Sequence, residues 1–416
     1  MDNKPGLLSL SLPQFIKFLK SEQIKKFFFV YNDEKKSIEA SHKKLQSIAD
    51  YFSQDKRDFI KHEGWFCKIS ENYEMLLGAF VHRTNRGQAA GGVRFWTYEN
   101  AEDYFRDGLR LGAGMTFKNA MAGLWWGGGK GVIAHNPEYD KMDSVIREKI
   151  YQEYGEFISS LNGCYVTAED VGTSVDDMAN VFSGTRFTTC IPQKFGGSGN
   201  PSEPTAKGII SGMEAALDFL NLGTLEEKTV AVQGLGHVGE PLIGLLLDRK
   251  VKKVIGTDIN PGNIDLVSKK YSDKKLEFHL VKKDDLSIFG LPCDIFSPNA
   301  TGAILNPTTI PLLKTKIVCG AANNQLADEK YHGEMVGKQG ILYAPDYVVN
   351  AGGIINVYYE LEGYNRERAM LHAEKIYDTT FNLFQLAKKE GIPTYMAANH
   401  LAEQRLESIA RINAVR

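Results

Sequence analysis

Two lysines occupy positions where an ammonium group could take part in chemistry. Lys118 closes the segment Gly114-Met115-Thr116-Phe117-Lys118, and Lys130 closes Gly127-Gly128-Gly129-Lys130 twelve positions later. A protonated lysine can hold a carboxylate as a point charge, whereas a desolvated lysine can lose its proton near neutral pH and act as a base. The alternative is a pair of ordinary solvated lysines. The glycines before Lys130 favour close backbone approach, so we expect a functional pair.

A dinucleotide-binding turn is predicted further along the chain. The segment Thr229–Gln233 is predicted to be a buried strand, and the turn Gly234-Leu235-Gly236-His237-Val238-Gly239 leads from it into an apolar helix over 241–247. Glycines at this spacing permit a tight turn and the approach of a pyrophosphate to a helix N-terminus. Asp258 ends the next predicted strand, where its carboxylate would accept a ribose hydroxyl and repel a 2′-phosphate, which favours NAD over NADP. The alternative is a glycine-rich structural turn.

The composition is typical of a water-soluble protein with two domains. The chain has 416 residues, 43% hydrophobic and 24% charged, and its net charge of −2 gives no argument for a nucleic acid or membrane partner. Five scattered cysteines predict reduced thiols in the cytoplasm, and nine histidines without metal-ligand spacing predict no metal site. No apolar run has membrane-spanning length, and no signal peptide is expected.

Strands and helices alternate along most of the chain. Apolar positions at helical spacing within residues 1–60 predict two or three short amphipathic helices, over 15–20, 24–30 and 41–52. Strands are predicted over 64–81, 91–95, 125–133 and 164–167, and helices over 99–114 and 144–161. Residues 168–173 then follow the carboxyl end of a strand, where α/β sheets bind their ligands.

A domain boundary is predicted at the glycine- and proline-rich stretch 195–201. A long helix is expected over 205–220, and a Rossmann-type segment extends from 229 to about 350. The tail, 366–416, is predicted to be helical and to pack back on the first domain.

Seven segments resemble, in order, the signature blocks of the glutamate/leucine/phenylalanine/valine dehydrogenases. These are Gly91-Gly92-Val93-Arg94, Gly114-Met115-Thr116-Phe117-Lys118, Gly127-Gly128-Gly129-Lys130-Gly131, Thr167-Ala168-Glu169-Asp170-Val171-Gly172-Thr173, Gly197-Ser198-Gly199-Asn200-Pro201, Ala321-Ala322-Asn323-Asn324-Gln325-Leu326 and Ala344-Pro345-Asp346-Tyr347-Val348-Val349-Asn350-Ala351-Gly352-Gly353. The resemblance covers the chain from residue 64 onwards, and nothing carries over to the first sixty residues.

The resemblance implies an α/β fold with two domains and a homo-oligomer. Its N-terminal α/β domain would bind substrate and carry the oligomer contacts, and a Rossmann domain would bind the dinucleotide. Combined with the predicted elements, this gives a helical extension over 1–60, a substrate domain over 61–197 plus about 366–416, and an NAD-binding domain over 198–350, with a C-terminal helical return.

The resemblance also implies reversible oxidative deamination of an L-amino acid to a 2-oxo acid and ammonia, with NAD. Lys118 would bind the substrate carboxylate, Lys130 would be the general base that activates water, and Asp170 would carry a proton to and from the nitrogen. On local sequence alone, Asp170 could instead be a helix cap or turn residue. The other implied substrate contacts are Ala90, Gly91, Gly92, Met115, Ala168, Asn324, Ile354 and Val357. The implied dinucleotide contacts are Thr205, Gly234, Gly236, His237, Val238, Gly239, Asp258, Ile259, Asn299, Ala300 and Asn323.

The substrate side chain is expected to be apolar. Where glutamate-specific members carry a lysine and a serine, this chain has Ala90 and Val357, and an unpaired carboxylate buried against them would cost several kcal/mol. Ala168 and Ile354 resemble the branched-chain type, which we favour. The small Ala90 leaves room for phenylalanine or tryptophan, so an aromatic substrate remains an alternative, as does glutamate more remotely.

Two further classes of protein remain as alternatives. A catalytically inactive NAD-binding regulator would be expected to lack one of the chemical residues, and Lys118, Lys130 and Asp170 are all present. A hydroxyacid dehydrogenase would need a histidine–carboxylate pair, and His237 lies inside the glycine turn. Dependence of NADH oxidation on ammonium would separate these classes.

Overall fold

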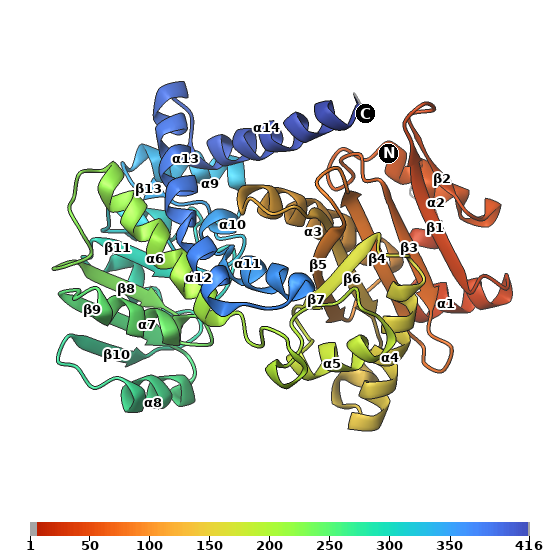
Figure 1. Ribbon diagram of the computed structural model, residues 1–416, viewed down its shortest axis with the longest axis horizontal. Helices are drawn as coiled ribbons and strands as arrows, with labels where there is room; N and C mark the ends of the chain where they lie inside the picture. The colour runs from red at the N-terminus through yellow and green to blue at the C-terminus, as the bar shows by residue number, and fades with distance from the viewer. Residues whose placement is uncertain (1–5, 415–416) are drawn as a thin grey trace. The chain divides into compact units, whose positions relative to one another are not determined.

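The computed structural model describes residues 6–414. The chain forms two compact units (Figure 1). Unit 1 comprises Met1–Gly199, Glu360–Tyr364 and Leu406–Arg416, and unit 2 comprises Asn200–Tyr359 and Asn365–Arg405. The change of unit at residues 199 and 200 lies inside the stretch 195–201 that the sequence marks as a boundary.

Unit 1 is built on a mixed sheet of seven strands in the order β2-β1-β3-β4-β6-β5-β7. Its strands are β1 (Lys26–Asn32), β2 (Ser37–Ala40), β3 (Gly64–Ile69), β4 (Leu76–Arg83), β5 (Ala89–Trp96), β6 (Gly127–Ala134) and β7 (Tyr165–Glu169). Its helices are α1 (Leu12–Ser21), α2 (Gln46–Ser53), α3 (Ala101–Met121), α4 (Ser144–Ser159) and α5 (Val175–Gly184). Short 3-10 turns cover Gly6–Ser9, Lys43–Leu45, Pro137–Lys141 and Gln193–Phe195. Strand β5 pairs in parallel with both β6 and β7.

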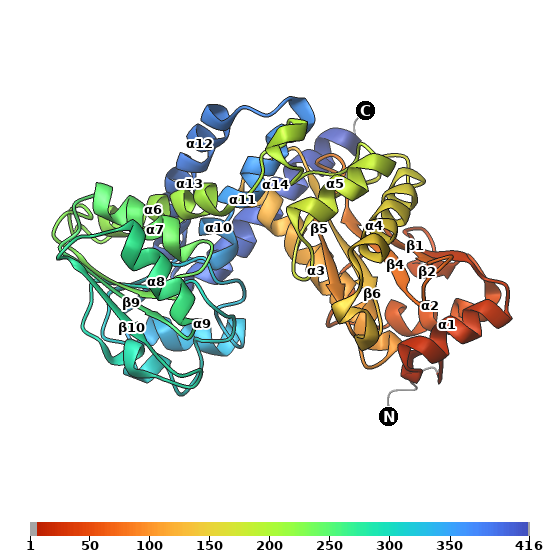
Figure 2. The ribbon, with the colours of Figure 1, turned by 90° about the horizontal axis from the view of Figure 1, so that it is seen from below.

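Helices α3 and α4 cover opposite faces of this sheet (Figure 2). A Cβ at Gly128 of β6 would meet Thr116 of α3, whereas a Cβ at Gly131 would meet the hydroxyl of Tyr154 in α4. Residues three apart in a strand point to opposite faces, which explains the two different neighbours.

Unit 2 contains a parallel sheet of six strands in the order β10-β9-β8-β11-β12-β13. Its strands are β8 (Thr229–Gln233), β9 (Lys253–Asp258), β10 (Leu276–Leu280), β11 (Ile295–Pro298), β12 (Ile317–Val318) and β13 (Leu342–Tyr343). Its helices are α6 (Ser202–Phe219), α7 (Gly239–Asp248), α8 (Pro261–Lys270), α9 (Glu329–Lys338), α10 (Asp346–Val349), α11 (Gly352–Tyr358), α12 (Arg366–Glu374) and α13 (Ile376–Glu390). Helix α14 (Thr394–Ala414) continues into unit 1, and further 3-10 turns cover Ser287–Gly290, Ile310–Leu312 and Tyr359–Glu362. The strand order reverses beside β8, which makes this the point where a doubly wound sheet binds a dinucleotide.

The N-terminal segment is not purely helical, so that prediction is wrong in part. Helices α1 and α2 lie at the expected places, but residues 24–30 fall largely in strand β1, and β2 adds the sheet edge. The reason is alternation with period two, because Phe27 and Phe29 are buried while Phe28 and Val30 are exposed. The extension therefore continues the sheet of unit 1.

The C-terminal return also differs from the prediction that 366–416 packs on the first domain. Helices α12 and α13 pack on α6 of unit 2. The rings of Phe219 and Phe384 lie 5.4 Å apart, and the Lys207 ammonium lies 2.8 Å from Glu374. The segment from Leu406 onwards belongs to unit 1.

Helix α3 is longer than the predicted span 99–114. Asn100 caps its start by accepting a hydrogen bond from the backbone N–H of Asp103, and the helix continues to Met121. Gly108 does not break it, because a Cβ there would lie 2.4 Å from the Phe80 ring and glycine gives the closest packing on the sheet. Lys118 therefore lies on this helix, beyond the predicted span.

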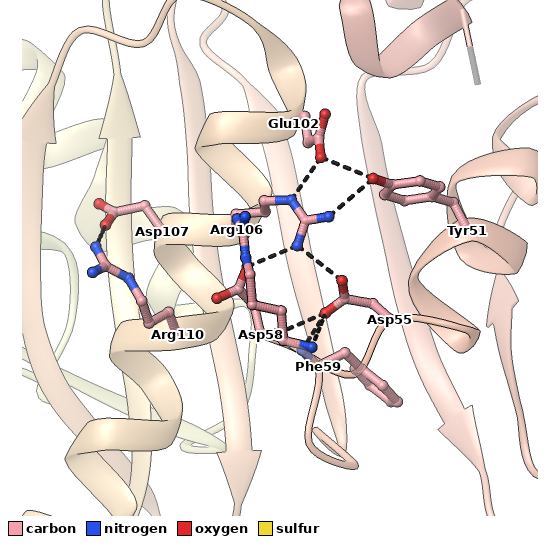
Figure 3. Close-up of polar contacts among 9 residues, drawn as sticks. Tyr51, Asp55, Asp58, Phe59, Glu102, Arg106, Asp107 and Arg110 are labelled. Atoms are coloured by element: carbon pink, nitrogen blue, oxygen red, sulfur yellow. Dashed lines mark hydrogen bonds and ion pairs between the residues drawn. The ribbon is translucent and has the colours of Figure 1, made fainter. Parts of the chain in front are cut away.

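Arg106 of α3 connects this helix to the N-terminal segment. Its guanidinium lies 2.6 Å from Glu102, 2.7 Å from Asp58, 2.9 Å from Asp55 and 2.9 Å from the Tyr51 hydroxyl (Figure 3). Its side chain is 13% exposed. Burial alone would lower the pKa of Arg106, but the hydrogen bonds that Arg106 donates to the three carboxylates hold it above its usual value. The cation therefore pairs with three anions from two segments of the chain.

We predict that Arg106→Leu lowers the free energy of unfolding by about 3–5 kcal/mol, because three partly buried carboxylates lose their common cation. Chemical denaturation followed by fluorescence measures this change. Arg110→Leu, one turn further along α3, is the matched control. Arg110 pairs with Asp107 but is 60% exposed, so its loss should cost less than about 1 kcal/mol. Equal losses in the two variants would contradict a special role for Arg106.

Candidate active site

Lys130 and Asp170 form a direct ion pair in unit 1. Lys130 lies on β6 and is 4% exposed, and its Nζ lies 2.7 Å from Oδ2 of Asp170, the residue after β7. Burial alone would raise the pKa of Asp170, but the positive charges of Lys130 and Arg94 outweigh it and hold that pKa below its usual value. The structure thus brings together the two residues that the sequence marks as chemical, with the carboxyl group in its ionised form.

The paired glycines of β5 are tightly enclosed, and Gly92 lies against Asp170. A Cβ at Gly92 would lie 2.7 Å from Cβ of Asp170, and a Cβ at Gly91 would lie 2.0 Å from the carbonyl oxygen of Gly129 and 3.0 Å from Cγ of Met115. Real Cβ contacts are not this short, so larger residues would push the strands apart.

The other predicted substrate residues of unit 1 lie on the same elements. Ala168 of β7 pairs with Gly92, and both Ala168 and Ala90 are buried. Lys118 is half-buried on α3, three residues after Met115, so the two side chains share one helix face. The role of Lys118 in holding a carboxylate remains a prediction.

The glycine turn of unit 2 has the conformation that its sequence predicts. Gly234 has φ +91°, which suits glycine alone among ordinary residues, and a Cβ there would press on Ala300 at 3.0 Å. A Cβ at Gly239, where α7 begins, would lie 2.1 Å from the carbonyl oxygen of Gly234. At Gly236 the nearest atom to a Cβ is Nδ2 of Asn263 at 3.8 Å, so the space beside it is open. The turn therefore combines a tight bend, close helix packing and an approachable backbone.

Asp258 lines a cavity beside this turn. Its carboxylate accepts hydrogen bonds from the backbone N–H of Leu235 (2.8 Å), from the backbone N–H of Asn260 (2.8 Å) and from Nδ2 of Asn263 (3.1 Å). The cavity measures about 220 Å³, and its lining includes Gln233, Gly234, Asp258, Ile259, Lys282, Lys283 and Ala300. A carboxylate can accept about four hydrogen bonds, so Asp258 retains capacity for a ribose hydroxyl.

The remaining predicted residues of unit 2 are anchored by local contacts. Asn299 accepts from the backbone N–H of Ala321 (2.9 Å), and Asn323 accepts from Nδ2 of Asn350 (2.7 Å). Thr205 donates to the carbonyl of Pro201 at 2.8 Å. Contact of Asn299, Asn323 and Thr205 with a dinucleotide remains a prediction.

Five further predicted site residues lie in unit 2, namely His237, Val238, Asn324, Ile354 and Val357. His237 and Val238 belong to the glycine turn, and Asn324 has φ +52°. Ile354 and Val357 are three residues apart in α11, with Val357 buried, so they share one helix face. Contact of these residues with a ligand remains a prediction.

Sequence reasoning overlooked three residues near Asp170, namely Arg94, Asp107 and Tyr98. Arg94 lies 3.5 Å from Asp170, and Asp107 accepts hydrogen bonds from both Arg94 and Tyr98. A cation two residues after the paired glycines, inside an otherwise apolar strand, was the signal that could have identified Arg94. Lys282 and Lys283 were overlooked because they lie in an exposed loop after β10.

Three further observations concern metal sites, membrane-spanning helices and disulfides. Among the described residues, no group of three or more histidines, cysteines or carboxylates is placed to hold a metal ion. No helix in that part of the chain is both long enough and apolar enough to cross a membrane. All five cysteines are free thiols.

Comparison with known proteins identifies the family. Residues 70–187 match the dimerisation domain of the Glu/Leu/Phe/Val dehydrogenases, and residues 196–412 match the Glutamate/Leucine/Phenylalanine/Valine dehydrogenase family. The chain belongs to this family. It is therefore an amino acid dehydrogenase with an N-terminal dimerisation domain and a Rossmann-type domain, as the sequence resemblance predicted.

Individual relatives cover most of the chain. The leucine dehydrogenase of Thermoactinomyces intermedius is 49% identical over 80% of this chain and 87% of its own, and that of Geobacillus stearothermophilus is 45% identical over 83% and 90%. The crystal structure of L-tryptophan dehydrogenase from Nostoc punctiforme superposes with a TM-score of 0.71 at 37% identity, covering 84% of this chain and 97% of that one.

The residues of unit 2 fit the nicotinamide dinucleotide that this family uses. The open backbone at Gly236 suits a pyrophosphate, and the N-terminus of α7 provides a positive dipole end beside it. The cavity at Asp258 offers a carboxylate acceptor for ribose hydroxyls. Unit 2 therefore carries the features that a bound dinucleotide requires.

We predict that two alanine substitutions in the turn change different properties, one the stability of unit 2 and the other the affinity for the dinucleotide. Gly239→Ala should destabilise unit 2 by about 1–3 kcal/mol, since its methyl group would overlap the backbone oxygen of Gly234. Gly236→Ala should keep the melting temperature of the wild type but weaken dinucleotide binding by roughly 10- to 100-fold, because its methyl group fills the open space. Thermal unfolding and fluorescence titration with NADH measure the two effects. Normal NADH affinity in Gly236→Ala would contradict this account of the turn.

Proposed function

We propose that this protein catalyses the NAD-dependent, reversible oxidative deamination of a branched-chain L-amino acid to the 2-oxo acid and ammonia. The observation that carries the proposal is the buried Lys130–Asp170 pair beside Gly91 and Gly92. The 49% identity with a leucine dehydrogenase supports the branched-chain substrate.

The residues of unit 1 supply the proton chemistry that such a reaction needs. Bound NAD would provide the acceptor for the hydride that leaves the α-carbon. Lys118 holds the substrate carboxylate by its charge, and Asp170, as an ionised carboxylate, takes a proton from the substrate nitrogen. Lys130 removes a proton from the water molecule that adds to the imine carbon. Asp170 returns a proton to the nitrogen when ammonia leaves, and the second proton of the added water passes to solvent as the 2-oxo acid forms.

Asp258 favours NAD over NADP. A 2′-phosphate would place a second anion against its carboxylate, which is 9% exposed at the cavity. Lys282 and Lys283 line the same cavity, but Asp284 and Asp285 beside them offset their charge. The buried carboxylate thus has the larger effect on the choice of dinucleotide.

An aromatic amino acid is the second candidate substrate. Ala90 is smaller than the leucine common in branched-chain enzymes, and the chain resembles L-tryptophan dehydrogenase in structure as well as sequence. Glutamate is the least favoured, because neither Ala90 nor Val357 can pair with a side-chain carboxylate.

We further propose a homo-oligomer in the cytoplasm. The support for assembly is the match of residues 70–187 to a dimerisation domain. The support for the compartment is the set of five unpaired thiols, which a reducing environment preserves.

A panel of 2-oxo acids with ammonium and either NADH or NADPH tests the function. The expected ranking places 4-methyl-2-oxopentanoate first, with NADH preferred over NADPH. A first place for the tryptophan or phenylalanine oxo acid would support the second candidate. Oxidation of NADH without ammonium, or with none of the oxo acids, would overturn the proposal.

We predict that Lys130→Ala lowers turnover by about 10²- to 10⁴-fold, the usual contribution of a general acid or base, while NADH binding survives. Lys68→Ala is a matched control, because Lys68 is also a buried, ion-paired lysine of the same sheet, with Nζ 3.1 Å from Glu153. It should lose stability but keep the turnover of the folded protein. Turnover of Lys130→Ala within tenfold of wild type would exclude the general-base role.

We predict that Ala90→Leu shifts the preference from bulky toward branched aliphatic side chains. The added methylenes overlap large substrates and gain apolar contact with small ones, about 0.8 kcal/mol for each buried methylene. Values of kcat/KM for leucine, valine, phenylalanine, tryptophan and glutamate measure this shift. Ala89→Val overpacks the neighbouring buried position and should leave the ranking unchanged. An unchanged leucine-to-phenylalanine ratio in Ala90→Leu would remove Ala90 from the pocket.

A further inference from the structure

Asp170 has a second cation beside it in addition to Lys130. Nε of Arg94 lies 3.5 Å from Oδ2 of Asp170, the same oxygen that Nζ of Lys130 contacts at 2.7 Å. The Arg94 side chain is 22% exposed, and its buried Nε makes no hydrogen bond within the described residues. The carboxylate of Asp170 is therefore the nearest compensation for this buried N–H group.

Arg94 is held from its other end by Asp107 of α3. Nη1 of Arg94 donates to Oδ2 of Asp107 at 2.8 Å, and the Tyr98 hydroxyl donates to the same oxygen at 2.7 Å. Arg110 donates to the second oxygen, Oδ1, at 2.8 Å (Figure 3). Asp107 is thus fixed by three donors, and the plane of the Arg94 guanidinium is fixed by Asp107.

We propose that Arg94 is a positioning residue that holds the Asp170 carboxylate against Lys130 as a proton acceptor, and that Asp107 and Tyr98 fix Arg94 for this task. The consequence for turnover rests on the proposed function. The charge effect on Asp170 depends on the geometry alone.

The two cations differ in what happens to them during the reaction. A lysine that acts as a base must be uncharged at some stage, and at that stage it no longer attracts Asp170. An arginine stays charged throughout the accessible pH range, and its planar fork can contact two carboxylates at once. Arg94 therefore keeps one positive charge beside Asp170 when Lys130 is neutral.

The other titratable groups around Asp170 cannot replace Arg94. They are Glu169 and Tyr165 of β7, Tyr98 after β5 and Cys190 after α5. Burial raises the pKa of each of these groups, which leaves the tyrosines and the thiol neutral, and Glu169 can add only negative charge. Burial alone would raise the pKa of Asp170 as well, and the charges of Lys130 and Arg94 reverse that effect.

The experiment titrates the Asp170 carboxyl group directly. Difference infrared spectra of protein labelled with ¹³C-aspartate, referenced to the Asp170→Asn variant, report its protonation against pH without any need for activity. In Arg94→Met the titration should move to higher pH, because the carboxylate loses a cation. In Arg94→Lys it should move less, since a lysine restores charge but not the fork. Arg249→Gln is the matched control, because Arg249 is an ion-paired arginine of unit 2, with Nε 2.7 Å from Glu214, and belongs neither to β5 nor to the network around Asp107. The titration in this variant should equal that of wild type.

Turnover in the same variants tests the catalytic consequence. We predict that kcat falls by about 10- to 100-fold in Arg94→Met, the effect of a misplaced catalytic group, with a smaller change in KM for the amino acid. The acidic limb of kcat/KM should move to higher pH along with the infrared titration. An unmoved infrared titration in Arg94→Met would overturn the inference. A moved titration in a protein that deaminates no amino acid would leave the charge effect in place and reject the proposed function instead.

Discussion

Burying the ammonium of Lys130 constrains the whole sheet of unit 1. An isolated charge in this position would cost several kcal/mol, so a carboxylate must reach it. That carboxylate, on Asp170, follows β7, whereas Lys130 lies on β6, and strand β5 runs between them. The ion pair therefore spans β5, and a Cβ at Gly92 of that strand would lie 2.7 Å from Cβ of Asp170. This explains Gly92 by geometry, independently of any substrate.

The same constraint extends to α3 and the N-terminal segment. Helix α3 covers the face of the sheet next to β6 and carries Asp107, which fixes Arg94 beside Asp170. The residue before Asp107, Arg106, joins α3 to Asp55 and Asp58. The extension thus supports the helix on which Lys118 lies, and strands β1 and β2 widen the sheet beneath it. The first sixty residues serve the fold of unit 1, even though the family match begins after them.

Local signals were predictable from the sequence, whereas signals that depend on distant packing were not. The conformation of the glycine turn was predicted correctly because its strand, turn and helix are continuous in the sequence and Gly239 packs on Gly234 within this unit. Residues 24–30 were predicted as helix because three successive phenylalanines satisfy helical and strand periodicity alike, and pairing with β3 decides between them. The predicted span 99–114 was too short, because helix α3 packs on β4 and β6 and continues to Met121. Lys130 and Asp170 were found by motif. Arg94 ends the block Gly91-Gly92-Val93-Arg94, but it was overlooked because its partners Asp170 and Asp107 lie on other elements.

Asp258 shows why recognition and fold cannot be separated in unit 2. Its Oδ2 accepts from the backbone N–H of Leu235, inside the glycine turn, and from Asn263 of α8. The backbone N–H of Gly234 donates to the carbonyl of Thr257, which precedes Asp258. The end of β9 therefore holds the turn in its bent shape, and Asp258 also lines the cavity beside that turn. A substitution of Asp258 would consequently change the turn and the preference for the ribose together, so any altered cofactor preference must be separated from a general loss of dinucleotide affinity.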